Sequence, residues 1–250
     1  FLWSTSWVLI KIGLEDIPAL TFAGLRYSLA FACLLPLALW AERNGSPNGS
    51  RSDSRGALRG LSARQWLRLG LLGLLLYAVT QGAQFLGLSL LPAVTVSLLL
   101  NFTTSVVALL GIGWLREVPG LRQWSGILLA AAGSLIYFYP VDLPAAQLLG
   151  LAIVAAGVLA NAVSAVLGRQ INRDEGLPPL VVTVVSMGIG GGLLLLAGVL
   201  TQGWPPLALR HWAIIAWLAL VNTAFAFTLW NRTLQTLSAV ESSIVNNTML

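Results

Sequence analysis

A succession of long apolar runs constrains this chain more than any other feature. Residues 66–90 and 93–115 are predominantly apolar, and only a Leu-Pro turn separates the two runs. A helix needs about 20 apolar residues to cross the hydrocarbon core of a bilayer, and both runs reach that length. The whole chain is 57% hydrophobic and 9% charged, whereas a soluble domain carries about 25% charged residues. The sequence therefore predicts an all-α, polytopic membrane protein.

The same reasoning predicts nine membrane helices separated by short turns. One longer polar loop, residues 42–65, is rich in Gly, Ser, Asn and Arg. Residues 1–13 would cover only about 20 Å of the roughly 30 Å core, so we expect truncated helices at both ends of the chain. The predicted helices cover residues 1–14, 18–41, 66–90, 93–115, 122–139, 146–169, 178–201, 211–235 and a last segment from 239.

Arginines are distributed unequally between the two sides of this predicted topology. With a cytoplasmic N-terminus, the loops and helix ends on that side hold eleven arginines, and the opposite side holds only Arg210. Cytoplasmic loops of membrane proteins carry an excess of Lys and Arg. Topology therefore explains the net charge of +5 better than a nucleic-acid partner does. We expect a multi-pass protein of the plasma membrane with its N-terminus in the cytoplasm.

Part of the sequence recurs later in the chain. A Pro opens both the helix from 18 and the helix from 178, and the start of the 93–115 run recurs 146 residues later. The matched positions are Ala93, Val94, Ser97 and Asn101 with Ala239, Val240, Ser243 and Asn247. An odd number of helices per copy gives the copies opposite orientations, as in many transporters. We therefore expect two inverted five-helix repeats, residues 1–140 and an incomplete 141–250, and ten helices in the intact protein.

Polar and aromatic side chains recur on single faces of several predicted helices. Polar groups inside a membrane are costly and need a partner or water. Amides, hydroxyls and aromatic rings that meet in one cavity would orient a polar organic solute with apolar parts. The alternative is that Ser, Thr and Asn hold helices together through interhelical hydrogen bonds. The candidate substrate-binding residues are Trp7, Lys11, Tyr77, Gln81, Gln84, Asn101, Asn161, Thr223, Phe227, Trp230 and Asn247.

Two basic residues lie inside the predicted spans. Lys11 is within one turn of the outer end of its helix, where it either snorkels to the interface or holds an anionic group such as a carboxylate. Arg26 lies two turns into the helix from 18, which is deep for snorkelling. We expect Arg26 to pair with Glu15, with Asp16 or with carbonyl groups at a helix end.

Two further features are predicted to serve helix packing rather than chemistry. Residues 188–192 read Gly-Ile-Gly-Gly-Gly inside an apolar run. Small residues let helices approach closely, and the Lys-Ser/Thr of a phosphate-binding loop is absent there. Glu117 ends its helix beside Arg116 and Arg122, at the negative end of the helix dipole. We therefore expect Glu117 to be tied to a neighbouring loop rather than to substrate.

The chain has few residues of the types that enzyme catalysis uses. One cysteine, Cys33, and one histidine, His211, leave no Cys/His zinc site. The acidic pairs at residues 15–16 and 174–175 fall in loops at opposite faces, so no carboxylate pair is formed. We expect a transporter with no cofactor and no metal. The alternatives are an intramembrane enzyme, such as a lipid-modifying transferase, and a structural membrane protein.

The order of these features resembles the EamA branch of the drug/metabolite transporter superfamily. The resemblance extends over nearly the whole chain, and it rests on the sequence of short motifs rather than on any single one. The residues that carry it are Trp3-Ser4 to Lys11-Ile12-Gly13-Leu14, Pro18 to Arg26-Tyr27, Pro92-Ala93, Leu115-Arg116-Glu117, Gln123-Trp124-Ser125-Gly126-Ile127, Ala132-Gly133, and Leu229-Trp230-Asn231-Arg232 to Leu237-Ser238-Ala239.

The resemblance implies a ten-helix fold and a central cavity lined by the first, third, fourth, sixth, eighth and ninth helices. It also implies transport, often export, of small metabolites such as amino acids across a bacterial or archaeal inner membrane. Alternating access would carry the solute, either coupled to protons or by facilitated diffusion. The sequence departs from the family pattern at Arg116, where the family has Gly, and it ends before the second Glu motif and helix ten.

Overall fold

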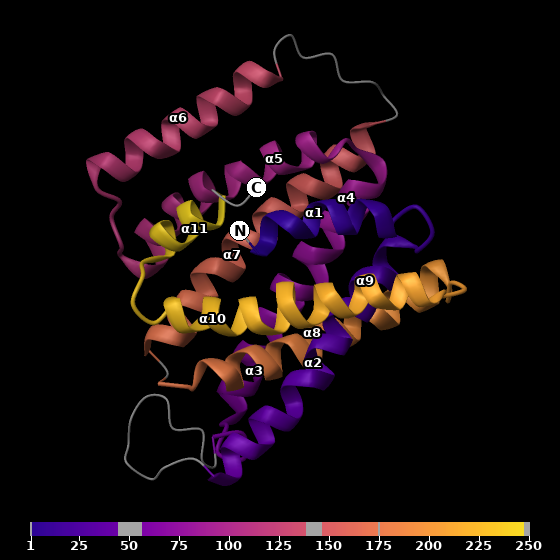
Figure 1. Cartoon of the computed structure of the whole chain (residues 1–250). Coiled ribbons are helices and arrows are strands. Elements are labelled where there is room, and N and C mark those ends of the chain that lie inside the picture. Colours follow the sequence, from indigo (N-terminus) through magenta and orange to yellow (C-terminus); the bar gives the residue numbers. More distant parts are fainter. Residues whose placement is uncertain (1, 45–56, 139–146, 175, 248–250) are drawn as a thin grey trace.

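Nine helices make up the part of the chain that the computed structural model describes, residues 2–44, 57–138, 147–174 and 176–247 (Figure 1). This count treats the π-helical segments as parts of longer helices: η1 and η4 interrupt a helix, and η2 ends one. In chain order the elements are α1 (Leu2–Gly13), α2 (Ala19–Asn44), α3 (Ala63–Gly73), η1 (Leu74–Gln81), α4 (Gly82–Leu90), α5 (Ala93–Leu110), η2 (Gly111–Leu115), α6 (Leu121–Tyr137), α7 (Leu148–Asp174), α8 (Pro179–Gln202), α9 (Leu209–Ala219), η4 (Leu220–Phe225), α10 (Ala226–Thr233) and α11 (Ala239–Asn247).

Six of these helices are long and apolar enough to cross a bilayer, judged by length and composition. The other three, α1, α6 and α11, have 12, 17 and 9 residues in the described part of the chain. The predicted all-α, polytopic architecture is therefore confirmed. The six candidate spans are Ala19–Arg43, Ala63–Leu90, Ala93–Leu115, Leu148–Asp174, Pro179–Gln202 and Leu209–Thr233.

The helix boundaries differ from the predicted ones at two polar ends. The helix expected from 66 begins at Ala63, because Ser62 and Gln65 form a capping box: Gln65 N–H donates to Ser62 Oγ over 3.3 Å, and Ser62 N–H donates to Gln65 Oε1 over 2.9 Å. The helix expected to end at 169 continues to Asp174. Polar side chains of that extra turn find partners on neighbouring helices, so the helix does not stop at the first arginine.

Helices α2 and α8 form the most extensive helix pair, and α8 also crosses α3 and η1. The crossing with the third helix is close enough to depend on glycine. A Cβ atom added to Gly190 would collide with the carbonyl oxygen of Gly73, and one added to Gly73 would collide with the carbonyl oxygen of Ser186. The glycine-rich segment of α8 is therefore a packing surface, as its composition predicts.

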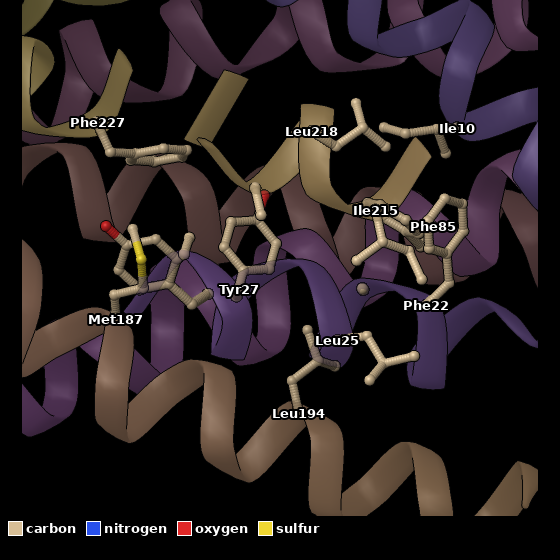
Figure 2. Close-up of a cluster of buried hydrophobic side chains, with 14 of the residues drawn as sticks. Ile10, Phe22, Leu25, Tyr27, Phe85, Met187, Leu194, Ile215, Leu218 and Phe227 are labelled. Atoms are coloured by element: carbon tan, nitrogen blue, oxygen red, sulfur yellow. The ribbon is translucent and has the colours of Figure 1, made fainter. Parts of the chain in front are cut away.

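A cluster of buried apolar side chains fills the space between α1, α2, α4, α8 and α9 (Figure 2). At one end of the cluster Phe22 meets Phe85 edge to face, with 5.3 Å between ring centroids. Farther along the cluster Tyr27 meets Phe227 edge to face, with 6.2 Å between ring centroids. Helix α6 lies at the edge of the bundle next to α5 (Figure 1). Most apolar side chains of α6 are exposed, as expected of a helix that faces lipid.

Irregular backbone segments recur at the spacing found in the sequence. The π-helical segments η1 and η4 begin at Leu74 and Leu220, which are 146 residues apart. The helices that contain them begin at Ala63 and Leu209, again 146 residues apart. Each segment also contains a threonine whose hydroxyl donates 2.8 Å to the carbonyl five residues earlier, Thr80 to Leu75 and Thr223 to Leu218, although these two threonines do not occupy matched positions. The recurrence therefore extends from residue types to departures from regular α-helix.

Candidate functional site

A pocket of about 110 Å³ lies among the helices, inside the apolar spans. All the helices that the family resemblance implies contribute to its lining, and α2 adds Arg26 and Tyr27. Arg26 is the one charged side chain among the lining residues of the described chain. The lining residues are Ser6, Trp7, Arg26, Tyr27, Leu72, Leu76, Thr80, Gln81, Gln84, Leu100, Thr103, Asn161, Ser164, Ala165, Gly168, Phe227, Trp230, Asn231, Leu234 and Ser243.

Six of the candidate residues from the sequence lie in this lining. They supply three amides and three aromatic rings, which is the combination that the sequence analysis associates with a polar organic solute. The structure brings them together from the first, third, sixth and eighth helices. These six residues are Trp7, Gln81, Gln84, Asn161, Phe227 and Trp230.

Two other candidates support the pocket from behind its lining. Tyr77 is fully buried, and its ring centroid lies 5.3 Å from that of Tyr27 and 5.2 Å from that of Phe227. Thr223 is also fully buried, and its hydroxyl binds Arg26. Both residues touch lining residues without lining the pocket themselves.

Of the three remaining candidates, two lie outside the pocket lining. The Lys11 ammonium donates a 2.6 Å hydrogen bond to the carbonyl oxygen of Leu88, near the C-terminal end of α4. Asn101 is half-buried on α5, outside the pocket lining. The side chain of Asn247 lies outside the described part of the chain.

Arg26 is a lining residue that was not among the substrate-binding candidates of the sequence analysis. The expected pairing with Glu15 or Asp16 is wrong, because Asp16 instead binds Arg210 and lies 3.2 Å from His211 Nε2. Arg26 points into the bundle and is 3% exposed. Its Nε donates to Thr223 Oγ1 over 2.7 Å, and its Nη2 lies 3.5 Å from the carbonyl oxygen of Asn222.

The π-helical segment η4 explains why Thr223 is available to Arg26. The Thr223 hydroxyl donates to the Leu218 carbonyl and accepts from Arg26 Nε, so the orientation of its O–H group is fixed. A π-helical turn shifts the backbone hydrogen-bonding pattern, and such turns are frequent at functional sites. The same segment directs the Asn222 carbonyl toward the guanidinium.

A second polar group beneath the pocket holds helices together. Asn231 Nδ2 donates to Thr183 Oγ1 over 2.9 Å, and Asn172 Nδ2 donates to Asn231 Oδ1 over 3.0 Å. These bonds join α10, α8 and α7. Asn231 lines the pocket, but its amide is committed to this network, so interhelical bonding is its role.

Glu117 is expected to be tied to a neighbouring loop, but its partners lie near the end of helix α7 and at the first residue of α11. Its Oε1 accepts from Arg169 Nε and Arg173 Nη1, each at 3.1 Å, and its Oε2 accepts from the Ala239 N–H at 3.1 Å. Arg169 Nη1 also donates 2.7 Å to the Leu234 carbonyl. This network connects the segment after η2, the end of α7 and the start of α11.

The described residues contain no group of three or more His, Cys, Asp or Glu side chains that could hold a metal ion. The pocket instead offers neutral donors and acceptors, aromatic faces and one guanidinium. Such a lining can bind and orient a small solute.

Comparisons with known proteins find relatives of this chain. An uncharacterized transporter of Archaeoglobus fulgidus is 29% identical over 132 residues, which cover 53% of this chain. The match spans 40% of that relative, so the chain corresponds to less than half of its length. A crystal structure of another protein has a TM-score of 0.74 at 18% identity, covering 99% of this chain and 80% of the other, which shows the shared fold.

A protein-family model gives the wider assignment. The model of the EamA-like transporter family matches residues 1–139 and 148–250, which is nearly the whole chain. The family is one of transporters and not of enzymes, so the intramembrane-enzyme alternative loses its basis. The chain belongs to the EamA-like transporter family.

Proposed function

We propose that this chain forms the core of a secondary transporter that moves small organic metabolites, such as amino acids, out of the cell by alternating access. The observation that carries the proposal is the pocket itself, in which amides and aromatic rings from separate helices meet inside the membrane-spanning region. The proposed repeats, residues 1–140 and 141–250, would rock about this pocket to open it to each side in turn.

The lining indicates how a solute would be held. Gln81, Gln84 and Asn161 can donate to and accept from the polar groups of a solute, because each amide carries both functions. Trp7 and Trp230 offer flat apolar faces against which carbon chains or rings pack. A solute with a polar head and a short apolar part fits both kinds of contact.

The size of the pocket sets an upper limit on the solute in this conformation. The volume is about 110 Å³, whereas pockets for drug-sized ligands occupy about 300–1,000 Å³. Solutes of amino-acid size therefore fit the proposal better than nucleotides or large drugs.

Counterflow in proteoliposomes tests the proposal. Purified protein is expected to exchange at least one radiolabelled amino acid or related metabolite, and Trp230→Ala is expected to slow the exchange at least about tenfold, or about 1.4 kcal/mol. Trp40→Ala is the matched control, since Trp40 is 66% exposed at the end of α2. A pH gradient across the vesicles would show whether protons are coupled. Absence of exchange from folded protein, or equal loss in both variants, would contradict the proposal.

The cytoplasmic N-terminus remains a proposal, and single cysteines can test it. In a Cys33→Ser background, Arg64→Cys at the start of α3 is expected to react with a membrane-impermeant maleimide only in inverted vesicles. Ala208→Cys at the start of α9 is expected to react only in intact cells. Successive helices cross the membrane in opposite directions, so the third and the eighth helix begin on opposite sides. Both positions are exposed. The opposite labelling pattern would reverse the orientation.

A further inference from the structure

We propose that Arg26 is the anion anchor of the pocket and that the transported solutes carry a carboxylate. This inference deepens the proposed function and rests on it, because it names the solute class of the same pocket. It starts from an arginine that is buried, lines the pocket and has no acidic partner among the described residues.

The Arg26 guanidinium keeps hydrogen-bonding capacity for a ligand. A guanidinium has five N–H donors in a planar fork. Within the described chain its hydrogen bonds go from Nε to the Thr223 hydroxyl and from Nη2 to the Asn222 carbonyl, and the latter is long at 3.5 Å. Nη1 makes none of these bonds. The pocket-facing part of the fork is therefore available.

The charge of Arg26 is not balanced by a neighbouring acid. No carboxylate of the described residues lies within 4.0 Å of this guanidinium, and the acidic residue expected nearest, Asp16, binds Arg210 and His211. Ionisable groups inside a membrane are costly unless they are paired, and they commonly mark substrate pathways. A hydroxyl and a carbonyl solvate the guanidinium, but neither brings negative charge. An anionic solute would supply that charge.

The chemistry of the remaining lining favours a carboxylate over other charged groups. An arginine fork matches the two oxygens of a carboxylate, and cations would be repelled by it. Leu76, Leu100 and Trp230 form apolar walls suited to a short hydrocarbon part. The small volume leaves little room for the larger phosphate group and its ester. Small organic carboxylates therefore satisfy charge, shape and size together.

Thr223 acts in this proposal as a positioning residue. Its hydroxyl is held by the Leu218 carbonyl and in turn holds Arg26 Nε, so the plane of the guanidinium is set before a solute arrives. Preorganised donors bind more tightly because less conformational freedom is lost. Thr223→Val keeps the shape of the side chain and removes this bond.

Equilibrium binding of four matched probes to the purified protein tests the anchor. All four probes carry a phenyl group. In 3-phenylpropanoate, 3-phenylpropanamide and 3-phenylpropylammonium a short hydrocarbon chain joins it to the polar group, and in phenyl phosphate a single ester oxygen does. By calorimetry, we expect the carboxylate to bind at least about tenfold more tightly than the amide, since 1.4 kcal/mol is tenfold. The ammonium is expected to bind most weakly. This comparison uses the unaltered chain and needs no variant to fold.

Variants then assign the preference to Arg26. Arg26→Gln is expected to remove the preference for the carboxylate, Arg26→Lys to keep part of it, and Thr223→Val to reduce it. Arg43→Gln, an exposed charge at the other end of α2, is the matched control and is expected to keep the full preference. Equal affinity for acid and amide, absence of binding by all four probes, or retention of the preference in folded Arg26→Gln would overturn the anchor. Tighter binding of phenyl phosphate would replace carboxylates by phosphate esters.

The same probes separate this inference from the proposed function. Counterflow that ignores solute charge would overturn the anchor and leave the transporter proposal in place. Binding of the carboxylate without any counterflow would overturn the transporter proposal and leave Arg26 as an anion site.

Discussion

Gly190→Val is expected to destabilise the helix bundle more than any other single substitution of a small residue on the same face of α8. The added side chain would meet the Gly73 carbonyl and the Tyr77 Cβ, which lies 2.8 Å from an ideal Cβ at residue 190. Backbone cannot rotate away as a flexible side chain can, so α8 must separate from the third helix. Overpacking of this kind costs about 1–3 kcal/mol or more.

The measurement is the thermal unfolding midpoint of the purified protein in detergent. A loss of about 3 kcal/mol corresponds to a decrease of about 6–12 °C for a chain of this size. Gly192→Val is the matched control, because a Cβ at residue 192 meets no atom within 4 Å. Midpoints that agree within about 2 °C for the two variants would contradict the close crossing.

The crossing also bears on function, because η1 carries pocket residues. Tyr77 lies directly against Gly190, and Thr80 and Gln81 follow within the same π-helical segment. Separation of α8 from this segment would move these side chains relative to Arg26 on α2. Gly190→Val protein that still folds is therefore expected to lose solute binding as well.

Most of the fold follows from the sequence because the bilayer leaves few alternatives. Backbone polar groups in hydrocarbon must be paired within the segment, so an apolar run of sufficient length becomes a helix. Short turns such as Leu90 to Pro92 then fix adjacent, antiparallel helices. Hydrophobicity alone does not locate helix ends in polar sequence, which is why Asn172 and Asp174 fall inside α7 rather than after it.

The sequence does not predict where the π-helical segments lie, and the reason is physical. A π-helical turn has the same apolar composition as the α-helix around it, and its distinguishing bond joins residues five apart. The threonines at 80 and 223 make such bonds, but an isolated threonine in an apolar helix has many other possible roles. Thr223 is a substrate-binding candidate by sequence, whereas in the structure its hydroxyl accepts a hydrogen bond from the Arg26 guanidinium.

Sequence reasoning located those lining residues that share one face of a single helix. Gln81 and Gln84 lie in the lining because residues at helical spacing point the same way. Arg26 was not identified because the partner of a long side chain depends on which helix lies opposite. Its acidic neighbours in sequence, Glu15 and Asp16, are exposed at the helix end, while Thr223 lies 197 residues away.

Arg116 has a backbone conformation that is uncommon for a residue with a side chain. Arg116 follows η2 with a φ of 56°, the left-handed conformation that glycine adopts readily. A residue with a side chain pays about 1–2 kcal/mol for this conformation. The Glu117 N–H donates 3.1 Å to the Gly111 carbonyl, and this bond closes the turn in which Arg116 takes the left-handed conformation.

Glu117→Gln is expected to be the most damaging single change among the charged residues of the described chain. Its carboxylate is shared by Arg169 and Arg173, whose side chains are 10% and 35% exposed. Removal of one charge from such a group leaves a poorly solvated guanidinium, which costs about 3–5 kcal/mol when fully buried. Because Arg173 is partly solvated, we expect about 2–4 kcal/mol.

The thermal unfolding midpoint is therefore expected to fall by about 5–15 °C. Asp174→Asn is the matched control, since it removes one carboxylate from the same Arg173 at a site that is 43% exposed. An exposed pair contributes about 0–1 kcal/mol, so this variant is expected to unfold near the unaltered protein. Equal midpoints for the two variants would show that the Glu117 network does not hold the helix ends together.

A double-mutant cycle then distinguishes loss of the ion pair from general damage. Arg169→Gln alone is expected to destabilise strongly, because it also removes the 2.7 Å bond to the Leu234 carbonyl. In the double variant with Glu117→Gln, the guanidinium that Glu117→Gln leaves unpaired is also gone. The double variant is therefore expected to lose about 1–3 kcal/mol less stability than the sum of the two single losses. Strict additivity would mean that Glu117 and Arg169 act independently. Such a result would leave Arg173 and the Ala239 N–H as the contacts through which Glu117 joins α7 and the start of α11.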